Sequence, residues 1–241
     1  SDLIENSLNK EYLYLQTEGL KKGPFYNFSA ARILLKKRGA GGEPDITLLA
    51  FSDIEGRFEF LSLFLLRPEL SFHGAMTGGA VRGFVRLAGK DSLLIRGAGI
   101  SMEGLPLFGP LGISGDGILS GNFLVRNNSG ELTFSVRDVK LRGSSLGGVF
   151  LPLDLFHDIK GAALFSDQTT EVKSFTMEGA GVYARVKGSM KANDMRMNFE
   201  LMTDSSFAGG PLVEMMLEKY KVSPGYYVVP IRGAMPEPAG G

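Results

Sequence analysis

The chain of 241 residues contains no cysteine and no tryptophan, and it has only two histidines. The absence of cysteine excludes disulfides, thiol nucleophiles, iron–sulfur clusters and thiolate zinc sites. Lysine plus arginine and aspartate plus glutamate each number 26, so the formal net charge is zero. Binding to the phosphate backbone of nucleic acids requires a basic footprint, which a neutral chain does not supply. A dedicated nucleic-acid binder is therefore not expected.

Long hydrophobic runs are also missing. A transmembrane helix needs about 20 mostly apolar residues, whereas the apolar stretch 60–66 ends at Arg67 and Pro68. The stretch 93–113 is interrupted by Arg96, Glu103, two prolines and several glycines, which predicts a strand and a loop. Because Ser1 opens directly into a polar segment, we expect that a native N-terminal membrane anchor is absent from this chain.

Glycine is abundant, and hydrophobic residues mostly alternate with polar ones. The 33 glycines are about twice the usual share of ~7%. Leu132, Phe134 and Val136 alternate with polar residues, as a half-buried strand requires. The same alternation occurs at 182–187 and at 195–202, on either side of the polar turn 191–194. This pattern predicts a β-hairpin over 181–202.

The rest of the chain predicts further strands and few helices. Strands are expected at 12–15, 31–35, 46–51, 57–65, 70–72, 81–87, 117–126 and 131–142. Helical spacing predicts one helix at 211–220, with shorter candidates at 3–10 and 153–159. The tail 236–241 is expected to be disordered. We predict a mainly β fold: a single elongated domain over 1–235, built as a long twisted or curled antiparallel meander, partly open and barrel-like, with one or two short helices.

The sequence offers no strong enzyme signature. His157 stands beside Asp158, but no G-x-S-x-G motif presents a serine nucleophile to such a pair. His73 is isolated, so the histidines lack metal-ligand spacing. The segment from Gly179 to Ala184 matches G-x-G-x-x-A, yet period-two residues follow it, which predicts a turn that begins a strand and not a nucleotide site. We therefore expect a non-enzymatic protein with no cofactor and no metal.

Several glycine-rich and hydrophobic segments carry a family resemblance. They are 117–123, 130–134, 139–143, 150–152, 177–184 and 224–233. Over about 115–235 the chain resembles the protein N family of the bacterial type II secretion system (GspN), and it is similar in style to AsmA-like periplasmic proteins, whose curled sheets enclose an apolar groove. The resemblance implies a periplasmic, non-enzymatic structural or interaction module that is associated with the inner membrane and binds other type II secretion components.

A second function class follows from apolar residues that share one parity of the later strands. These residues are Phe123, Val125, Leu132, Phe134, Val136, Val186, Met195, Met197, Phe199 and Leu201. With only one short amphipathic helix expected to cover them, they predict a concave groove that holds lipid acyl chains, as in a lipid-binding or lipid-transfer protein. The alternative is that the sheet folds onto itself and these residues form a closed core.

Overall fold

The computed structural model describes residues 13–37, 45–59, 68–86, 92–103, 105, 114–126, 129–142, 145–146, 149–150, 153–166, 169–191, 194–207, 215 and 217–234. In chain order the strands are β1 (Leu13–Glu18), β2 (Lys21–Lys22), β3 (Asn27–Lys37), β4 (Ile46–Phe58), β5 (Glu69–Met76), β6 (Gly79–Arg86), β7 (Ser92–Ser101), β8 (Ser114–Arg126), β9 (Ser129–Arg142), β10 (Ser145–Leu146), β11 (Val149–Phe150), β12 (Phe156–Ser166), β13 (Thr169–Gly179), β14 (Val182–Lys191), β15 (Asp194–Thr203), β16 (Lys221–Ser223) and β17 (Tyr226–Ala234). The described residues also form three short 3-10 helices, η1 (Pro24–Tyr26), η3 (Leu153–Leu155) and η4 (Glu218–Tyr220).

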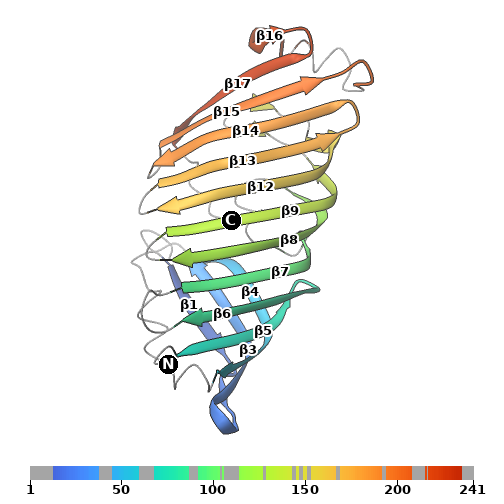
Figure 1. Ribbon diagram of the computed structural model, residues 1–241. Helices are drawn as coiled ribbons and strands as arrows, with labels where there is room; N and C mark the ends of the chain where they lie inside the picture. Colours follow the sequence, from blue (N-terminus) through green and yellow to red (C-terminus); the bar gives the residue numbers. More distant parts are fainter. Residues whose placement is uncertain are drawn as a thin grey trace.

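Almost all of these strands form one sheet of 15 strands in antiparallel pairs (Figure 1). The path follows the chain from β1 through β3–β9 and β12–β15 to β17 and β16, while β2 pairs with β3. β10 and β11 pair only with each other. The path is not closed, because β1 and β16 stand at its two ends. The mainly β, open meander that the sequence predicts is confirmed.

The sheet curls, so that its N-terminal strands turn back behind β6–β8 (Figure 1). Packing shows the same arrangement. Phe51 of β4 and Ile95 of β7 both contact one buried cluster, which contains Val81 and Ile100. Strands β4 and β7 are separated in the sheet by β5 and β6. Residues of the two strands can share a cluster because the same face of the sheet bends toward itself.

Three of the β-bulges in the described strands contain a residue with a positive φ. At each of them two residues on one strand oppose a single residue on the next, and one of the two has a positive φ: Asp53 on β4 (51°), Gly99 on β7 (69°) and Asp138 on β9 (54°). Glycine and aspartate tolerate this conformation better than most residues do. A bulge bends its strand and increases the local twist. The three positions therefore act as bending points along the meander.

Asp53 also explains an error in the predicted strands. The sequence predicts separate strands at 46–51 and 57–65, but β4 runs without a break from Ile46 to Phe58. The polar stretch between the two predictions is a bulge and not a turn. Glu59 follows the strand in coil conformation, and the remainder of the second predicted strand, 60–65, lies outside the described residues.

The helix predicted at 153–159 is wrong. Only Leu153–Leu155 is helical, as a 3-10 turn, and β12 begins at Phe156. Phe156 and Ile159 are both buried, and their spacing of three suggests a helix. The true cause of this spacing is a register shift between Phe156 and Asp158, which inserts His157 as an extra residue. A bulged strand can therefore imitate helical periodicity.

The other predicted elements have mixed outcomes. Met215 and Leu217 are helical and η4 follows at 218–220, so the described part of the predicted helix 211–220 agrees with it. The predicted helix at 3–10 and the tail 236–241 lie outside the described residues. The hairpin over 181–202 is confirmed by the pairing of β14 with β15. Among the described residues no helix has the length and apolarity that crossing a membrane requires.

Candidate functional site

The backbone register gathers the predicted groove residues on one face of the sheet, here called the apolar face. Phe123 lies opposite Leu132 on β8 and β9. Val186 lies opposite Phe199 on β14 and β15. Between these pairs, cross-strand partners continue the same face through β12 and β13. Since side chains of directly opposite residues point to the same side, the nine predicted residues whose side chains the structure describes, all except Met195, belong to this one face.

Glycines on the apolar face accommodate large aromatic rings. A Cβ added at Gly56 would lie 2.2 Å from the ring of Phe28, and one added at Gly161 would lie 2.3 Å from the ring of Phe134. In both cases the phenylalanine is the directly opposite residue on the neighbouring strand. The rings thus occupy the space that a side chain would fill. This packing accounts for part of the high glycine content.

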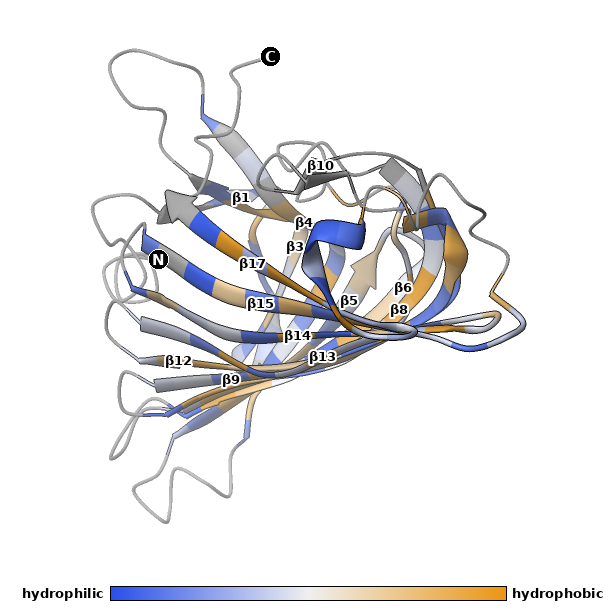
Figure 2. Cartoon of the chain, turned by 90° about the horizontal axis from the view of Figure 1, so that it is seen from above, coloured by the Kyte–Doolittle hydropathy of each residue, from blue (hydrophilic) through white to orange (hydrophobic). Residues whose placement is uncertain are grey.

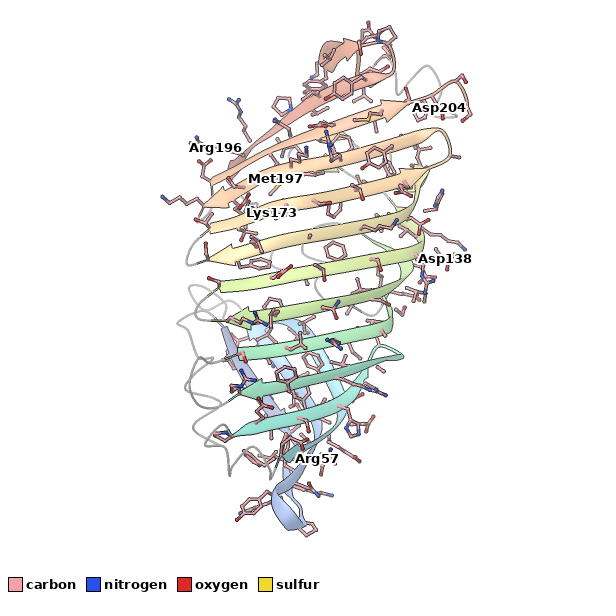
Figure 3. All side chains as sticks on the ribbon, viewed as in Figure 1. Arg57, Asp138, Lys173, Arg196, Met197 and Asp204 are labelled. Carbon is pink, nitrogen blue, oxygen red and sulfur yellow. The ribbon has the colours of Figure 1, made fainter. Side chains whose placement is uncertain are left out.

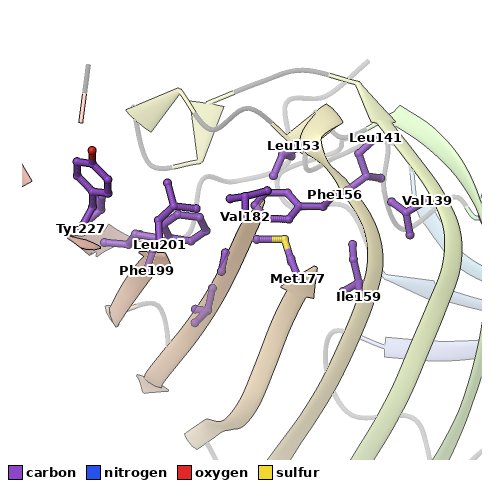
Figure 4. Packing of buried hydrophobic residues seen from close by; sticks show 14 of the residues in the cluster. Val139, Leu141, Leu153, Phe156, Ile159, Met177, Val182, Phe199, Leu201 and Tyr227 are labelled. Carbon is purple, nitrogen blue, oxygen red and sulfur yellow. The ribbon is translucent and has the colours of Figure 1, made fainter. Parts of the chain in front are cut away.

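One part of this face is covered and is here called the covered part. Val136, Val186, Phe199 and Leu201 are all buried, with exposed fractions between 1% and 8%. They belong to one large hydrophobic cluster, to which the connecting segments add Leu153, Leu217 and Phe207. Figure 4 shows Leu153 beside Phe156 in this cluster. For these four predicted residues the closed-core alternative is the one that the structure shows.

The neighbouring region is the open part of the apolar face, defined by Phe123, Val125, Leu132, Ile95, Phe165 and Val172. Each of these side chains is only partly buried. Phe123 lies across from Leu132 and packs edge-on against Phe165, with ring centroids 6.3 Å apart. Phe134 and Met197 are also partly buried and pack against the covered cluster, so they mark one boundary of the open part. Ile95 contacts the buried cluster of Val81 and Ile100 and marks the other boundary. The side chain of Met195 lies outside the described residues.

Sequence reasoning missed several residues of the open part. Ile95 lies opposite Phe123, and Val172 lies opposite Ala163, which itself faces Leu132. Val172 precedes a register shift on β13, and this shift breaks the simple alternation that parity arguments need. Ile95 is preceded by another apolar residue, Leu94, and followed by Arg96, so the sequence does not show an alternation of apolar and polar residues there. Only the pairing of neighbouring strands identifies these residues.

The opposite face of the sheet is mainly polar, and charged residues on it form cross-strand ion pairs. Figure 2 shows polar and apolar residues alternating along the curled strands. The Arg185 guanidinium hydrogen-bonds the Glu200 carboxylate, which raises the pKa of Arg185 above its usual value. Two further ion pairs join residues of the same strand: Lys173 and Arg196 (Figure 3) pair with Glu171 and Asp194 at 2.8 and 2.9 Å.

The two histidines do not form a common site. His157 Nδ1 lies 2.9 Å from Asp158 Oδ2, and His73 Nε2 lies 3.4 Å from Glu55 Oε2. One histidine is on β12 and the other on β5, and four strands of the sheet separate them. Across the described ranges, no group of three or more histidine, aspartate or glutamate side chains has an arrangement that could hold a metal ion.

The G-x-G-x-x-A segment lies where the sequence predicts it. Gly179 ends β13, Gly181 adopts a φ of 69°, and β14 begins at Val182. No helix starts here, so the backbone lacks the helical N-terminus that binds the pyrophosphate of a dinucleotide. The prediction of a turn that begins a strand is confirmed.

Comparisons with protein-family models, curated proteins and solved structures give no match to this chain. The geometry and chemistry of the sheet therefore provide the grounds for a functional proposal, and the resemblance to the GspN family stays a prediction from the sequence.

Proposed function

We propose that this protein is a non-enzymatic component of the cell envelope that binds lipid acyl chains on the open part of its apolar face. The observation that carries the proposal is a row of large, partly exposed apolar side chains that crosses several adjacent strands. Phe123, Leu132 and Val172 belong to this row. Contiguous apolar surface on a folded protein commonly marks a site for a ligand or a partner.

The row has a suitable orientation and chemistry for an acyl chain. It runs perpendicular to the strands, and neighbouring strands are about 4.8 Å apart, so four strands span roughly 14 Å. Covering about 300 Å² of apolar surface would contribute roughly 7 kcal/mol at ~25 cal/mol per Å², before the costs of association. Met197 at the boundary adds a flexible thioether, which adapts to irregular apolar ligands.

Native mass spectrometry with lipid extraction tests this proposal. The purified protein is expected to carry lipid, and the double variant Phe123→Gln/Leu132→Gln is expected to lose most of it while keeping its circular dichroism spectrum. The matched control is Leu164→Gln, because Leu164 lies on the polar face of β12 with 37% exposure. The control should retain lipid. A lipid-free wild-type protein, or equal lipid content in both variants, would contradict the proposal.

A second candidate function is an interaction module of the type II secretion system, as the sequence resemblance implies. The observation that favours it is an incompletely paired sheet edge. On its outer side β17 pairs with β16 only at Tyr226 and Tyr227, so the backbone from Val228 onward has no strand on that side among the described residues. Such edges recruit partners by strand addition. Pro230 interrupts this edge, which limits a long β-pairing.

A pull-down from periplasmic and inner-membrane fractions, probed for individual type II secretion components, tests the second candidate. Specific enrichment of at least one inner-membrane component is expected. If none of them is enriched while lipid remains bound, the interaction role is rejected and the lipid-binding role stands.

A further inference from the structure

The polar face contains a shallow hollow over β6 and β7, on the side of the sheet opposite to the apolar face. Its volume is about 450 Å³, and it is lined by Ala80, Arg82, Phe84, Leu94, Arg96 and Ala98 together with the backbone of two glycines. The two strands pair directly here, with Ala80 opposite Ala98 and Phe84 opposite Leu94. Small residues thus lie on one side of the hollow and large apolar residues on the other.

Between these two pairs lie two arginines. Arg82 is directly opposite Arg96, and both side chains are exposed. Like charges directly opposite each other on adjacent strands are destabilising. Neither guanidinium forms an ion pair with a described residue. The sheet therefore holds two adjacent positive charges that its described side chains do not neutralise.

The residues around the arginine pair are uncharged or already paired. Arg82 faces His73 on β5, and that imidazole is 3.4 Å from the Glu55 carboxylate. On the other side Arg96 faces Asn122 on β8. Asn122 adds an amide that can donate a hydrogen bond to an anion. No carboxylate lies directly opposite either arginine in the register of β5–β8.

We propose that Arg82 and Arg96 bind an oxyanion, a carboxylate or a phosphate, that is attached to an apolar group. Two guanidinium forks supply several parallel N–H donors, the arrangement that carboxylates and phosphates prefer. The anion also removes the repulsion between the two arginines. Phe84 and Leu94 are partly buried beside them and provide a surface on which the apolar body of the ligand packs. This site is independent of the acyl-chain proposal, because it lies on the other face of the sheet.

NMR titration of the arginine Nε–Hε signals tests the site directly. The probes are inorganic phosphate, phenyl phosphate and benzoate. We expect shifts of the Arg82 and Arg96 signals with all three, and at least threefold tighter binding of phenyl phosphate than of inorganic phosphate, since its ring packs on Phe84 and Leu94. The double variant Arg82→Gln/Arg96→Gln should weaken phenyl phosphate binding at least tenfold.

The matched control is Arg137→Gln/Lys140→Gln, which removes two exposed positive charges from the same face on β9. It should leave phenyl phosphate binding within twofold of wild type. If the control weakens binding as much as the arginine double variant does, only general electrostatic attraction is present and the site is rejected. Unshifted arginine signals at saturating probe concentrations would also reject it.

Vesicles distinguish the source of the oxyanion. Phosphatidylcholine vesicles with 25% phosphatidic acid present the phosphate on a membrane, whereas phenyl phosphate presents it in solution. Co-sedimentation that depends on Arg82 and Arg96 assigns the site to a lipid head group. Binding of the soluble probe without co-sedimentation assigns it to a free ligand, and failure of both overturns the proposal.

Thermal unfolding provides a readout that does not need a ligand. At low salt, Arg82→Gln should raise the Tm by about 1–2 °C because it removes the repulsion with Arg96. Phenyl phosphate should raise the Tm of wild type but not that of the double variant. A lower Tm for Arg82→Gln in the absence of ligand would show that the arginine has a structural role, and would contradict the proposal.

Discussion

The covered and open parts of the apolar face consist of similar residues but differ in what lies over them. In the covered part Phe199 and Leu201 are each only 1% exposed, and residues such as Leu153 and Leu217 from outside the main sheet complete the cluster. In the open part Phe123 and Leu132 remain partly exposed. Hydrophobicity alone therefore does not determine whether a sheet face becomes core.

The connections between strands account for this difference. From β8 to β15, the hairpins nearest the open part leave only two residues between strands, at 127–128, 167–168 and 192–193. The connections nearest the covered part include the segments 143–155 and 204–220, which carry Leu153, Phe207 and Leu217. A connection of two residues is too short to reach across a sheet face, whereas a long connection can place apolar side chains on it. The lengths of the connections thus decide which part is sealed.

The largest expected loss of stability comes from a substitution at the centre of the covered part. Phe199→Ala should lower the free energy of unfolding by about 3–5 kcal/mol, because it leaves a cavity among tightly packed neighbours. Urea denaturation measured by circular dichroism provides the value. A loss below about 1.5 kcal/mol would mean that this part is not a closed core.

A smaller loss of stability is expected from substitutions at glycines that are covered by aromatic rings. Gly161→Ala places a methyl group against the ring of Phe134 and should cost about 1–3 kcal/mol. Combining it with Phe134→Leu should recover part of the loss, since the smaller side chain makes room. The matched control is Gly130→Ala, where the nearest atom would lie at 3.5 Å and the change should be neutral or slightly stabilising. Equal destabilisation at both glycines would contradict the packing argument.

These packing relations show what the sequence could and could not predict. Alternation is a local property, so it identifies the strands around 132–136 and 182–201 and their common apolar parity. Bulges interrupt local periodicity, which is why the strand through Asp53 is predicted as two and the start of β12 as a helix. The division into covered and open parts depends on contacts between distant segments, such as Leu217 with the cluster. No local pattern contains that information.

The third expected loss of stability is smaller still and comes from a substitution in the open part. Phe123→Ala should lower the free energy of unfolding by about 1 kcal/mol, because a partly exposed ring loses only part of its burial on truncation. Urea denaturation under the conditions used for Phe199→Ala allows a direct comparison. A loss as large as that at Phe199 would show that Phe123 is core, and the distinction between the two parts would then fail.

The smallest expected effect is a change in pH dependence at the turn that positions Phe207, one of the residues that cover the apolar face. The Asp204 carboxylate accepts hydrogen bonds from the Ser206 hydroxyl at 2.6 Å and from the Ser206 backbone N–H at 2.7 Å, and these hold the pKa of Asp204 below its ordinary value. The backbone carbonyl of Asp204 accepts a bond from the Phe207 N–H, and Phe207 packs against the covered cluster. The turn therefore connects a surface carboxylate with the packing of the covered part.

Because this pKa is lower in the folded protein, the stabilisation is fully present above the ordinary carboxyl pKa and is lost as the pH falls through the lowered value. Ser206→Ala should raise the pKa of Asp204 toward the ordinary value of about 3.9, and the Phe207 ring signals should begin to shift at a higher pH than in wild type. NMR titration of the Asp204 carboxyl carbon and of the Phe207 ring measures both changes. Ser205→Ala is the control, since the adjacent hydroxyl does not take part in these bonds. If the Phe207 signals do not follow the Asp204 titration, the turn does not position this residue, and Phe207 is held by its apolar contacts alone.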